Sequence, residues 1–279
     1  MKFIAKRRLA LCLAAFCLAA LLVFGNLPRR LDGLEVRVLN IGQGDAVLFR
    51  TADACVLIDA GPNYAEEKQC ADLCALGIKR IDLLILTHPD EDHIGGADLV
   101  LDRFTVELVC VAPLESDAPS HLRLLETVSA TGTAMHVGRA GDSFAYGELE
   151  LFLLAPAAAY ADANNASIVT RVTYGETAVL LMGDAEEEAE LALLADPPAP
   201  LTADLLKLGH HGANTSTSDA LLDAVRPTYA AISCGYANTY GHPARRVIDA
   251  LNARGIIVGR TDRDGTLIYH SDGKRLRQS

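Results

Sequence analysis

One segment of the chain reads Leu86-Thr87-His88-Pro89-Asp90-Glu91-Asp92-His93-Ile94-Gly95-Gly96, with two histidines and three carboxylates between positions 88 and 93. It follows the apolar run 81–86, which is typical of a buried strand. Polar groups gathered at a strand end cost free energy unless something pairs with them. A single divalent metal ion could pair with all of these groups, because carboxylates and neutral imidazoles are its ligands. The alternative is an acidic surface turn that happens to contain histidines.

Five further motifs place Asp, Asn or His beside apolar runs. They are LIDAG (57–61), NNAS (164–167), LLMGD (180–184), LGHHGAN (208–214) and YGHP (240–243). Taken singly, each has an ordinary explanation: Asp184 can cap a helix expected from residue 185, and a histidine can be a core or surface residue. Together they indicate a site, because strand ends of a layered fold meet at one edge.

Short apolar runs bounded by Gly, Pro or Asp predict strands. These lie at 35–41, 46–49, 55–59, 81–87, 106–111, 148–154, 167–174, 177–183, 204–208, 229–233, 256–258 and 266–269. Helices are predicted at 66–76, 120–130, 185–195, 218–225 and 244–254. Strand clusters interleaved with helices favour a layered α/β fold in one domain, residues 31–279.

Residues 1–30 have a different composition from the rest. Four basic side chains, Lys2, Lys6, Arg7 and Arg8, precede the uncharged 17-residue run 9–25. The run is short but sufficient to span a bilayer, and no small-x-small cleavage pattern follows it. We expect an uncleaved single-pass membrane anchor, with the N-terminus cytoplasmic and the domain extracellular. Cleavage of the segment as a signal peptide, which would leave a secreted domain, is the alternative.

The domain is acidic. All 36 Asp and Glu lie after residue 30, together with 19 Lys and Arg, which gives residues 31–279 a formal net charge of −17. This argues against a non-specific nucleic-acid-binding surface. It does not exclude a nuclease, because acidic metal ligands also count toward the sum. The basic stretch 274–277 is expected to be a solvated tail. Cys55, Cys110 and Cys234 are expected in the core, and the oxidation state of Cys70 and Cys74 is open.

In this order the motifs resemble the metallo-β-lactamase superfamily. More narrowly, they are similar to the extracellular hydrolase domain of ComEC-type competence proteins, the DNA-uptake channel family, which VLNIGQGDA (38–46) also matches apart from Asn40 in place of Asp. The resemblance covers about residues 35–269. It implies an α/β fold: an αββα sandwich of two mixed sheets flanked by helices. We expect a stand-alone, membrane-tethered relative without the channel.

The resemblance also implies roles for individual residues. His88 and Asp90 would serve one metal position, Asp92 and His93 a second, and Asp184 would bridge them. Asp59 would contact the metal ligands rather than the metal itself and so orient them. The last ligand is open among His210, His211 and His242. Asp45, Asn165 and Ser167 would line the substrate side.

Two departures from the superfamily pattern affect the expected metal. Asp90 stands where the second histidine is usual, and the Asn165 region replaces a lone histidine further along the chain. The first position is therefore rich in oxygen, which favours Mn²⁺ or Mg²⁺ over Zn²⁺ there, or a single ion. We expect one or two divalent ions, Mn²⁺ or Zn²⁺, with Mg²⁺ as the third candidate.

The expected reaction is metal-assisted hydrolysis. Asp92, His210 and His211 are the catalytic candidates, and a spare histidine at 210, 211 or 242 could protonate the leaving group. By analogy, the favoured reaction is phosphodiester hydrolysis, with DNA as the leading substrate. The alternatives are a hydrolase for a small phosphodiester or ester, and a non-catalytic surface module that holds metal. The sequence gives no basis for naming a protein partner.

Overall fold

The first strands of the domain pair with the last strands of the chain in the computed structural model, which describes residues 31–279. The resulting eight-stranded sheet has the order β17 (Leu276–Gln278), β16 (Leu267–Ser271), β1 (Leu34–Val38), β2 (Val47–Arg50), β3 (Cys55–Ile58), β5 (Leu83–Leu86), β7 (Leu108–Val111) and β8 (Ala134–Val137). Pairing is antiparallel from β17 to β3 and parallel from β3 to β8, so the sheet is mixed.

A second, seven-stranded sheet is also mixed. Its order is β15 (Ile257–Arg260), β14 (Tyr229–Ile232), β13 (Leu205–Lys207), β12 (Thr177–Leu181), β11 (Val169–Tyr174), β10 (Leu149–Ala155) and β9 (Ser143–Tyr146). Strands β12 to β15 are parallel, and β9 to β12 are antiparallel. A two-stranded ladder joins β4 (Arg80–Ile81) to β6 (Thr105–Val106).

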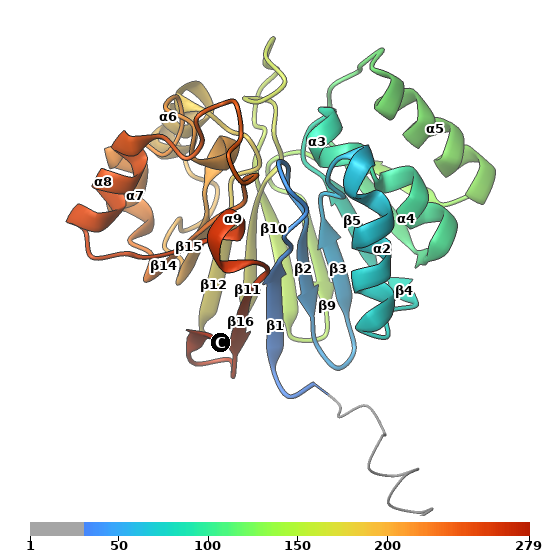
Figure 1. Ribbon diagram of the computed structural model, residues 1–279, viewed down its shortest axis with the longest axis horizontal. Coiled ribbons are helices and arrows are strands. Elements are labelled where there is room, and N and C mark those ends of the chain that lie inside the picture. Colours follow the sequence, from blue (N-terminus) through green and yellow to red (C-terminus); the bar gives the residue numbers. More distant parts are fainter. Residues whose placement is uncertain (1–30) are drawn as a thin grey trace, which may run out of the picture. The chain divides into compact units, whose positions relative to one another are not determined.

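Helices cover the outer face of each sheet (Figure 1). The first sheet is flanked by α2 (Glu66–Ala75), α3 (Glu91–Ile94), α4 (Ala97–Arg103) and α5 (Pro119–Thr131). The second is flanked by α6 (Glu187–Ala195), α7 (Asp219–Val225) and α8 (Arg245–Ala253). The short elements are η1 (Asn63–Ala65), η2 (Gly209–Gly212) and α9 (Thr261–Asp264).

Three apolar cores lie between these four layers. Along β5, Leu83 and Ile85 join the core between the sheets, whereas Leu84 and Leu86 pack with the apolar side chains of α2, α4 and α5. Covering a strand on both faces explains why its sequence is apolar without alternation. A third core lies between the second sheet and α6, α7 and α8. The predicted αββα sandwich of two mixed sheets is confirmed.

Several elements at the margins of the sheets have no sequence pattern strong enough to predict them. The edge strands β8 and β9 have mostly exposed or half-exposed side chains, so they lack an apolar pattern. The expectation of a solvated tail at 274–277 was wrong. Residues Leu276–Gln278 pair with β16, and Leu276 is buried. Helix α4 follows the Gly-Gly pair so closely that its start was not recognised.

The five cysteines within residues 31–279 all carry free thiols. Cys110 and Cys234 are buried as expected, whereas Cys55 is only partly buried. Cys70 and Cys74 are both unbridged; Cys70 is buried and Cys74 is exposed. The expected anchor at 1–30 lies outside the described residues. Within 31–279, every helix is too short or too polar to cross a bilayer.

Candidate metal centre

Parallel pairing brings the polar motifs to one edge of the sandwich. β3 and β5 run parallel in the first sheet, and β12, β13 and β14 run parallel in the second. The carboxyl ends of parallel neighbours lie at the same edge of a sheet. The residues that follow these strands therefore meet there, as the sequence analysis expected from strand ends in a layered fold.

The loop after β5 turns at once into α3. Asp90 has an extended backbone and precedes the first residue of that helix, Glu91. Asp92 and His93 consequently lie in its first turn, and His93 N–H donates to Asp90 O at 3.0 Å. His88 and His93 are buried, whereas the side chain of Asp90 remains 51% exposed.

Asp184 follows β12 after a left-handed turn. Gly183 has a φ of +55°, and a Cβ there would lie 2.9 Å from Ser167 Cβ, so only glycine fits. The N–H of Asp184 donates to Ser167 Oγ at 3.0 Å. Helix α6 begins only at Glu187, and the N–H groups of Glu186 and Ala189 at its start donate to Asn165 Oδ1 rather than to Asp184. The explanation of Asp184 as a simple helix cap is therefore wrong.

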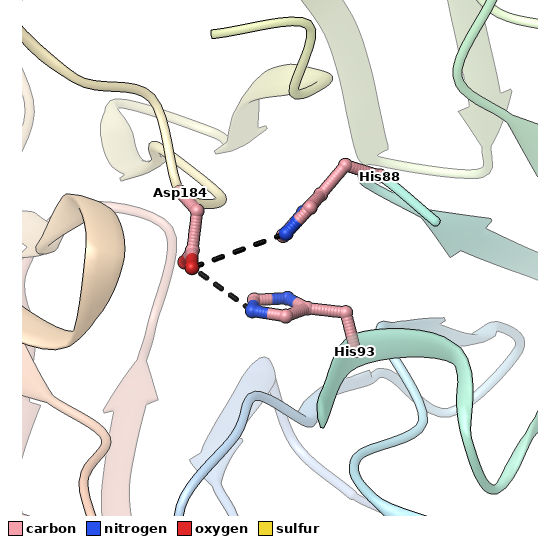
Figure 2. Close-up of side chains that lie close together, drawn as sticks. All are labelled: His88, His93 and Asp184. Atoms are coloured by element: carbon pink, nitrogen blue, oxygen red, sulfur yellow. Dashed lines mark ion pairs between the residues drawn. The ribbon is translucent and has the colours of Figure 1, made fainter. Parts of the chain in front are cut away.

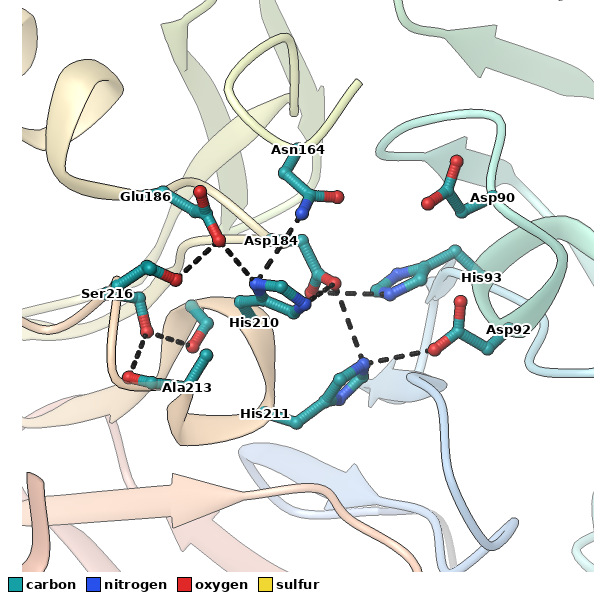
Figure 3. A network of polar contacts seen from close by, with 12 residues as sticks. Asp90, Asp92, His93, Asn164, Asp184, Glu186, His210, His211, Ala213 and Ser216 are labelled. Carbon is teal, nitrogen blue, oxygen red and sulfur yellow. Dashed lines mark hydrogen bonds and ion pairs between the residues drawn. The ribbon is translucent and has the colours of Figure 1, made fainter. Parts of the chain in front are cut away.

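The two adjacent histidines of η2 also have left-handed backbones. His210 has a φ of 45° and His211 a φ of 53°, both positive values that non-glycine residues rarely adopt. In Figure 3 the ring of His210 faces Asp184 from the side opposite His93, and the ring of His211 faces it from below. The turn thus presents two consecutive imidazoles to one point, which neither a strand nor a helix could do.

Three buried polar atoms at this point have no hydrogen-bond partner. They are His88 Nε2, His93 Nε2 and Asp184 Oδ1. His93 Nε2 lies 3.3 Å from Asp184 Oδ1, and His88 Nε2 lies 3.9 Å from Asp184 Oδ2 (Figure 2). One ligand atom from each residue lies within 4.8 Å of the other two. Buried polar groups are normally satisfied, so this convergence fits a divalent metal ion.

A second grouping shares His93 with the first. Asp92, His93 and His211 also offer ligand atoms within 4.8 Å of one another. His211 Nε2 lies 3.2 Å from Asp92 Oδ2 and 3.6 Å from Asp184 Oδ2. Asp184 lies between the two groupings, the placement that a bridging carboxylate requires.

The three candidate histidines take different places. His211 is buried within the second grouping, and His210 Nε2 lies 3.9 Å from Asp184 Oδ2. His242 stands beside them, with its ring centroid 5.2 Å from that of His210. Asp90 Oδ2 lies 3.8 Å from His88 Nε2. His88, Asp90 and His210 therefore surround Asp184 at the first metal position. His210 supplies there the imidazole that the sequence motifs did not assign to that position.

Neighbouring groups fix the orientation of each buried ring. Asp59 accepts from His93 Nδ1 at 2.8 Å and from the Thr87 N–H at 2.8 Å. His211 Nδ1 donates to Ser233 O at 2.9 Å. Because the Nδ1 proton is engaged in both rings, Nε2 is the nitrogen left for a metal. His88 has its Nδ1 between two hydroxyls, with Thr87 Oγ1 at 3.1 Å.

The protonation states of the side chains in the cluster depend strongly on one another. Burial alone would raise the pKa of the Asp184 carboxyl, but the charges of His93 and His211 hold that pKa well below its usual range. Conversely, burial would lower the pKa of His211, but Asp184, Asp45 and Asp92 raise it to about 10. Burial and the charge of His93 lower the pKa of His88 to about 3, so His88 is neutral. Metal binding requires neutral imidazoles and ionised carboxylates, so it would displace protons from this cluster.

The three residues predicted to line the substrate side, Asp45, Asn165 and Ser167, are all buried. Asn165 is buried, and its Oδ1 accepts the N–H groups of Glu186 and Ala189, which caps α6. Ser167 is fully buried behind Asp184. Asp45 is buried as well, in an ion pair with Lys207.

Two polar partners went unnoticed in the sequence. Lys207 Nζ lies 2.5 Å from Asp45 Oδ2 and is 1% exposed, so a complete ion pair underlies His211. Glu186 Oε1 accepts from His210 Nδ1 at 2.7 Å. A lysine at the end of an apolar run, as in LLKLG, is the signal that could have revealed the first. Nothing in the acidic run 186–188 distinguishes Glu186 from its neighbours.

The two-sheet sandwich with a His/Asp metal site at the strand ends defines a metal-dependent hydrolase of the metallo-β-lactamase fold. The family model described as "Metallo-beta-lactamase superfamily" matches residues 39–236, and the chain belongs to that superfamily.

Two curated relatives are each 34% identical to the chain over 84% of its length. They are ComE operon protein 3 of Bacillus subtilis, matched over 33% of that protein, and competence protein ComA of Neisseria gonorrhoeae, matched over 32% of that protein. The chain therefore spans about a third of the length of either. The resemblance to ComEC-type competence proteins is confirmed. A solved structure, the metallo-β-lactamase fold protein YhfI of Bacillus subtilis, shares the fold with a TM-score of 0.56 and 14% identity, over 84% of this chain and 99% of that one.

Proposed function

We propose that this chain is a metal-dependent phosphodiesterase whose leading substrate is DNA. The observation that supports the proposal most directly is the convergence of His88 Nε2, His93 Nε2 and Asp184 Oδ1, all buried and without hydrogen-bond partners. A divalent ion held there supplies an activated water and neutralises charge on a phosphoryl oxygen. One position would be held by His88, Asp90, Asp184 and His210, and the other by Asp92, His93, Asp184 and His211.

His210 and His242 are the groups that could hold a proton for the leaving oxygen. The ring of His210 is 26% exposed, and its Nδ1 donates a hydrogen bond to Glu186 Oε1, so Nε2 faces the site. Burial, and then the neighbouring His210, lower the pKa of His242 below its ordinary value. A neutral imidazole beside the metal site can accept and return a proton near neutral pH. If His210 is occupied as a ligand, His242 remains available for this task.

DNA is favoured because one of the two relatives is named a competence protein, and because the sequence motifs resemble those of the DNA-uptake channel family. We further propose that residues 1–30 anchor the chain in the cell membrane with the domain outside the cytoplasm, as the basic residues before the apolar run predict. A protease-accessible C-terminal tag on intact cells would support this orientation, and a protected tag would contradict it.

The direct test is an activity screen of the purified protein with Mn²⁺, Zn²⁺ or Mg²⁺. Its substrates are bis-p-nitrophenyl phosphate, single-stranded DNA and duplex DNA. We expect turnover of the small diester with at least one metal, and none in excess chelator. An inactive protein that nevertheless binds metal would favour the non-catalytic module.

A hydrolase for a small phosphodiester is the second candidate. It is favoured by the formal charge of −17 on residues 31–279, which repels a polyanion. Turnover of bis-p-nitrophenyl phosphate without cleavage of either DNA would select it.

A further inference from the structure

A cleft of about 870 Å³ opens beside the metal loop, with Asp90 and Asp92 in its wall. Of the eight tyrosines in the chain, all of which lie within 31–279, three are at least 70% exposed: Tyr64, Tyr236 and Tyr240. All three line this cleft, which we call the tyrosine cleft. A local concentration of exposed aromatic surface marks a binding site more often than chance exposure does.

The walls of the tyrosine cleft are tied together through Gln43. The hydroxyl of Tyr64 accepts from Gln43 N–H at 2.9 Å and lies 3.2 Å from Gln43 O. A Cβ at Gly42 would lie 2.6 Å from that hydroxyl, so glycine makes room for the ring. On the other wall, Gly235 N–H donates to Gln43 Oε1 at 3.1 Å, next to Tyr236. The backbone beneath two of the three rings is therefore fixed before any ligand arrives.

The third ring connects the tyrosine cleft to the metal edge. Tyr240 stacks on His242, with ring centroids 5.7 Å apart and an interplanar angle of 25°. His242 in turn meets His210 edge-on, with ring centroids 5.2 Å apart. A continuous row of rings thus leads from the cleft to the histidines around Asp184.

The charges around the tyrosine cleft are unsuited to a phosphate backbone. Among the described residues that line it, Arg123 is the one basic side chain, against the acidic side chains of Asp90, Glu91 and Asp92. Its Nη2 already donates to Asn63 Oδ1 at 2.8 Å and its Nε lies 3.4 Å from Asp98 Oδ2, which leaves Nη1 for a phosphate. A protein that grips nucleic acid through its phosphates needs several cations. A ligand of this cleft must therefore gain its affinity from uncharged planar groups, which aromatic faces bind by stacking.

We propose that the tyrosine cleft binds single-stranded DNA by stacking unpaired bases on Tyr64, Tyr236 and Tyr240, with Arg123 contacting one phosphate. This inference rests on the proposed phosphodiesterase activity and names its substrate class. A strand held on these rings would pass Asp90 and Asp92 on its way to the metal edge. Duplex DNA is disfavoured because its bases already stack on one another, which leaves their faces unavailable to the protein.

The test measures binding in EDTA, so that it does not depend on catalysis. Fluorescence anisotropy would compare a labelled 15-nucleotide oligothymidylate, an abasic strand of equal length and the matching duplex. The wild-type protein should bind oligothymidylate at least ten-fold more tightly than either of the others. Tyr236→Ala and Tyr240→Ala should each weaken that binding about ten-fold, the effect of losing one stacked base.

Two variants separate stacking from general damage. Tyr236→Phe keeps the ring and should bind as wild type. Leu191→Ala removes an exposed apolar side chain of α6 that is absent from the cleft, and it too should bind as wild type. Equal binding of the abasic strand, equal binding of the duplex, or unchanged binding by both alanine variants would overturn the proposal.

Salt dependence gives a second readout. With Arg123 as the one cation, the logarithm of the association constant should fall with the logarithm of salt concentration with a slope near −0.7, as for one phosphate contact on a single strand. A slope of −3 or steeper would overturn recognition through the bases. Turnover of bis-p-nitrophenyl phosphate by the wild-type protein reports the proposed phosphodiesterase separately. Base-dependent binding without turnover would contradict the phosphodiesterase proposal and support the binding cleft. Turnover without base-dependent binding would contradict only the proposed binding cleft.

Discussion

Two buried carboxylates, Glu35 on β1 and Asp184 after β12, are 4% and 3% exposed, yet their surroundings differ. Glu35 accepts four hydrogen bonds from Arg37 and Arg50, at 2.7 to 3.0 Å. Asp184 leaves Oδ1 without a hydrogen bond, and its Oδ2 lies 3.6 to 3.9 Å from three imidazole nitrogens. Burial alone therefore does not distinguish a structural carboxylate from a functional one.

The difference lies in whether the protein satisfies the oxygens itself. Around Glu35 the cations belong to the chain, so the cluster is complete once the protein has folded. Around Asp184 the neighbours are imidazoles and carboxylates arranged at distances too long for strong hydrogen bonds. The first cluster stabilises the fold, and the second is arranged to receive a cation from solution.

The largest expected effect is loss of metal from the Asp184 cluster. Asp92→Ala and His93→Ala should each weaken metal affinity about 100-fold or more, because each removes a ligand rather than a group behind it. Elemental analysis and titration calorimetry of the purified proteins measure this. Glu35→Gln is the matched control and should retain its metal. Undiminished metal in both alanine variants would show that the loop 88–93 does not form the site.

Asp184→Asn should lower turnover of bis-p-nitrophenyl phosphate about 100-fold, since a neutral amide is a poor ligand and cannot bridge two cations. In the metal-free protein its free energy of unfolding should fall, because the neutral amide no longer pairs with the charges of His93 and His211. Steady-state kinetics and denaturant unfolding provide the two values. Full activity in a folded Asp184→Asn protein would remove Asp184 from the site.

Glu35→Gln should reduce the free energy of unfolding by about 2 kcal/mol, the scale of hydrogen bonds to a charged group. Burial would raise the pKa of Glu35, but its bonds to Arg37 and Arg50 lower it overall. Such a carboxylate stabilises the protein above its unfolded-state pKa and loses that contribution as the pH falls through the folded value. The difference between wild type and Glu35→Gln should therefore shrink below about pH 4. A difference that grows on acidification would contradict this account.

Glu186→Ala should produce the smallest effect, about a ten-fold loss of turnover, because it frees the His210 ring without removing a ligand. Glu186→Gln retains an oxygen that can accept the Nδ1 proton and should recover most of the activity. Comparing the two variants at equal metal content separates ring positioning from metal loss. Equal activity in wild type and Glu186→Ala would show that His210 needs no support.

The sequence predicted the layers of the fold and the central side chains of the site. Strands such as 83–86 and 177–181 are covered on both faces, and the apolar runs that result are easy to recognise. The loop 88–93 and Asp184 could be found because each lies directly at a strand end. The edge strands β8 and β9 could not, because they bury too little apolar surface to leave a pattern.

The orientation of side chains required the structure. Adjacent histidines in a sequence give no indication that both face one point, since this depends on the left-handed backbone at 210 and 211. Likewise, Asn165 was expected to face the substrate, but its side-chain oxygen accepts hydrogen bonds from the backbone N–H groups at the start of α6. Polar residues at strand ends are thus detectable from sequence, whereas which of them face the ligand depends on local backbone geometry.

The left-handed backbone at His210 and His211 also bears on how this protein can change under selection. Each such residue costs about 1 to 3 kcal/mol, whereas glycine adopts the same conformation without that strain. The amino acids that would be most stable at these two positions are therefore not the ones that can bind a metal. Laboratory evolution for heat resistance alone should replace these histidines by glycine early, and only a simultaneous screen for activity would keep them.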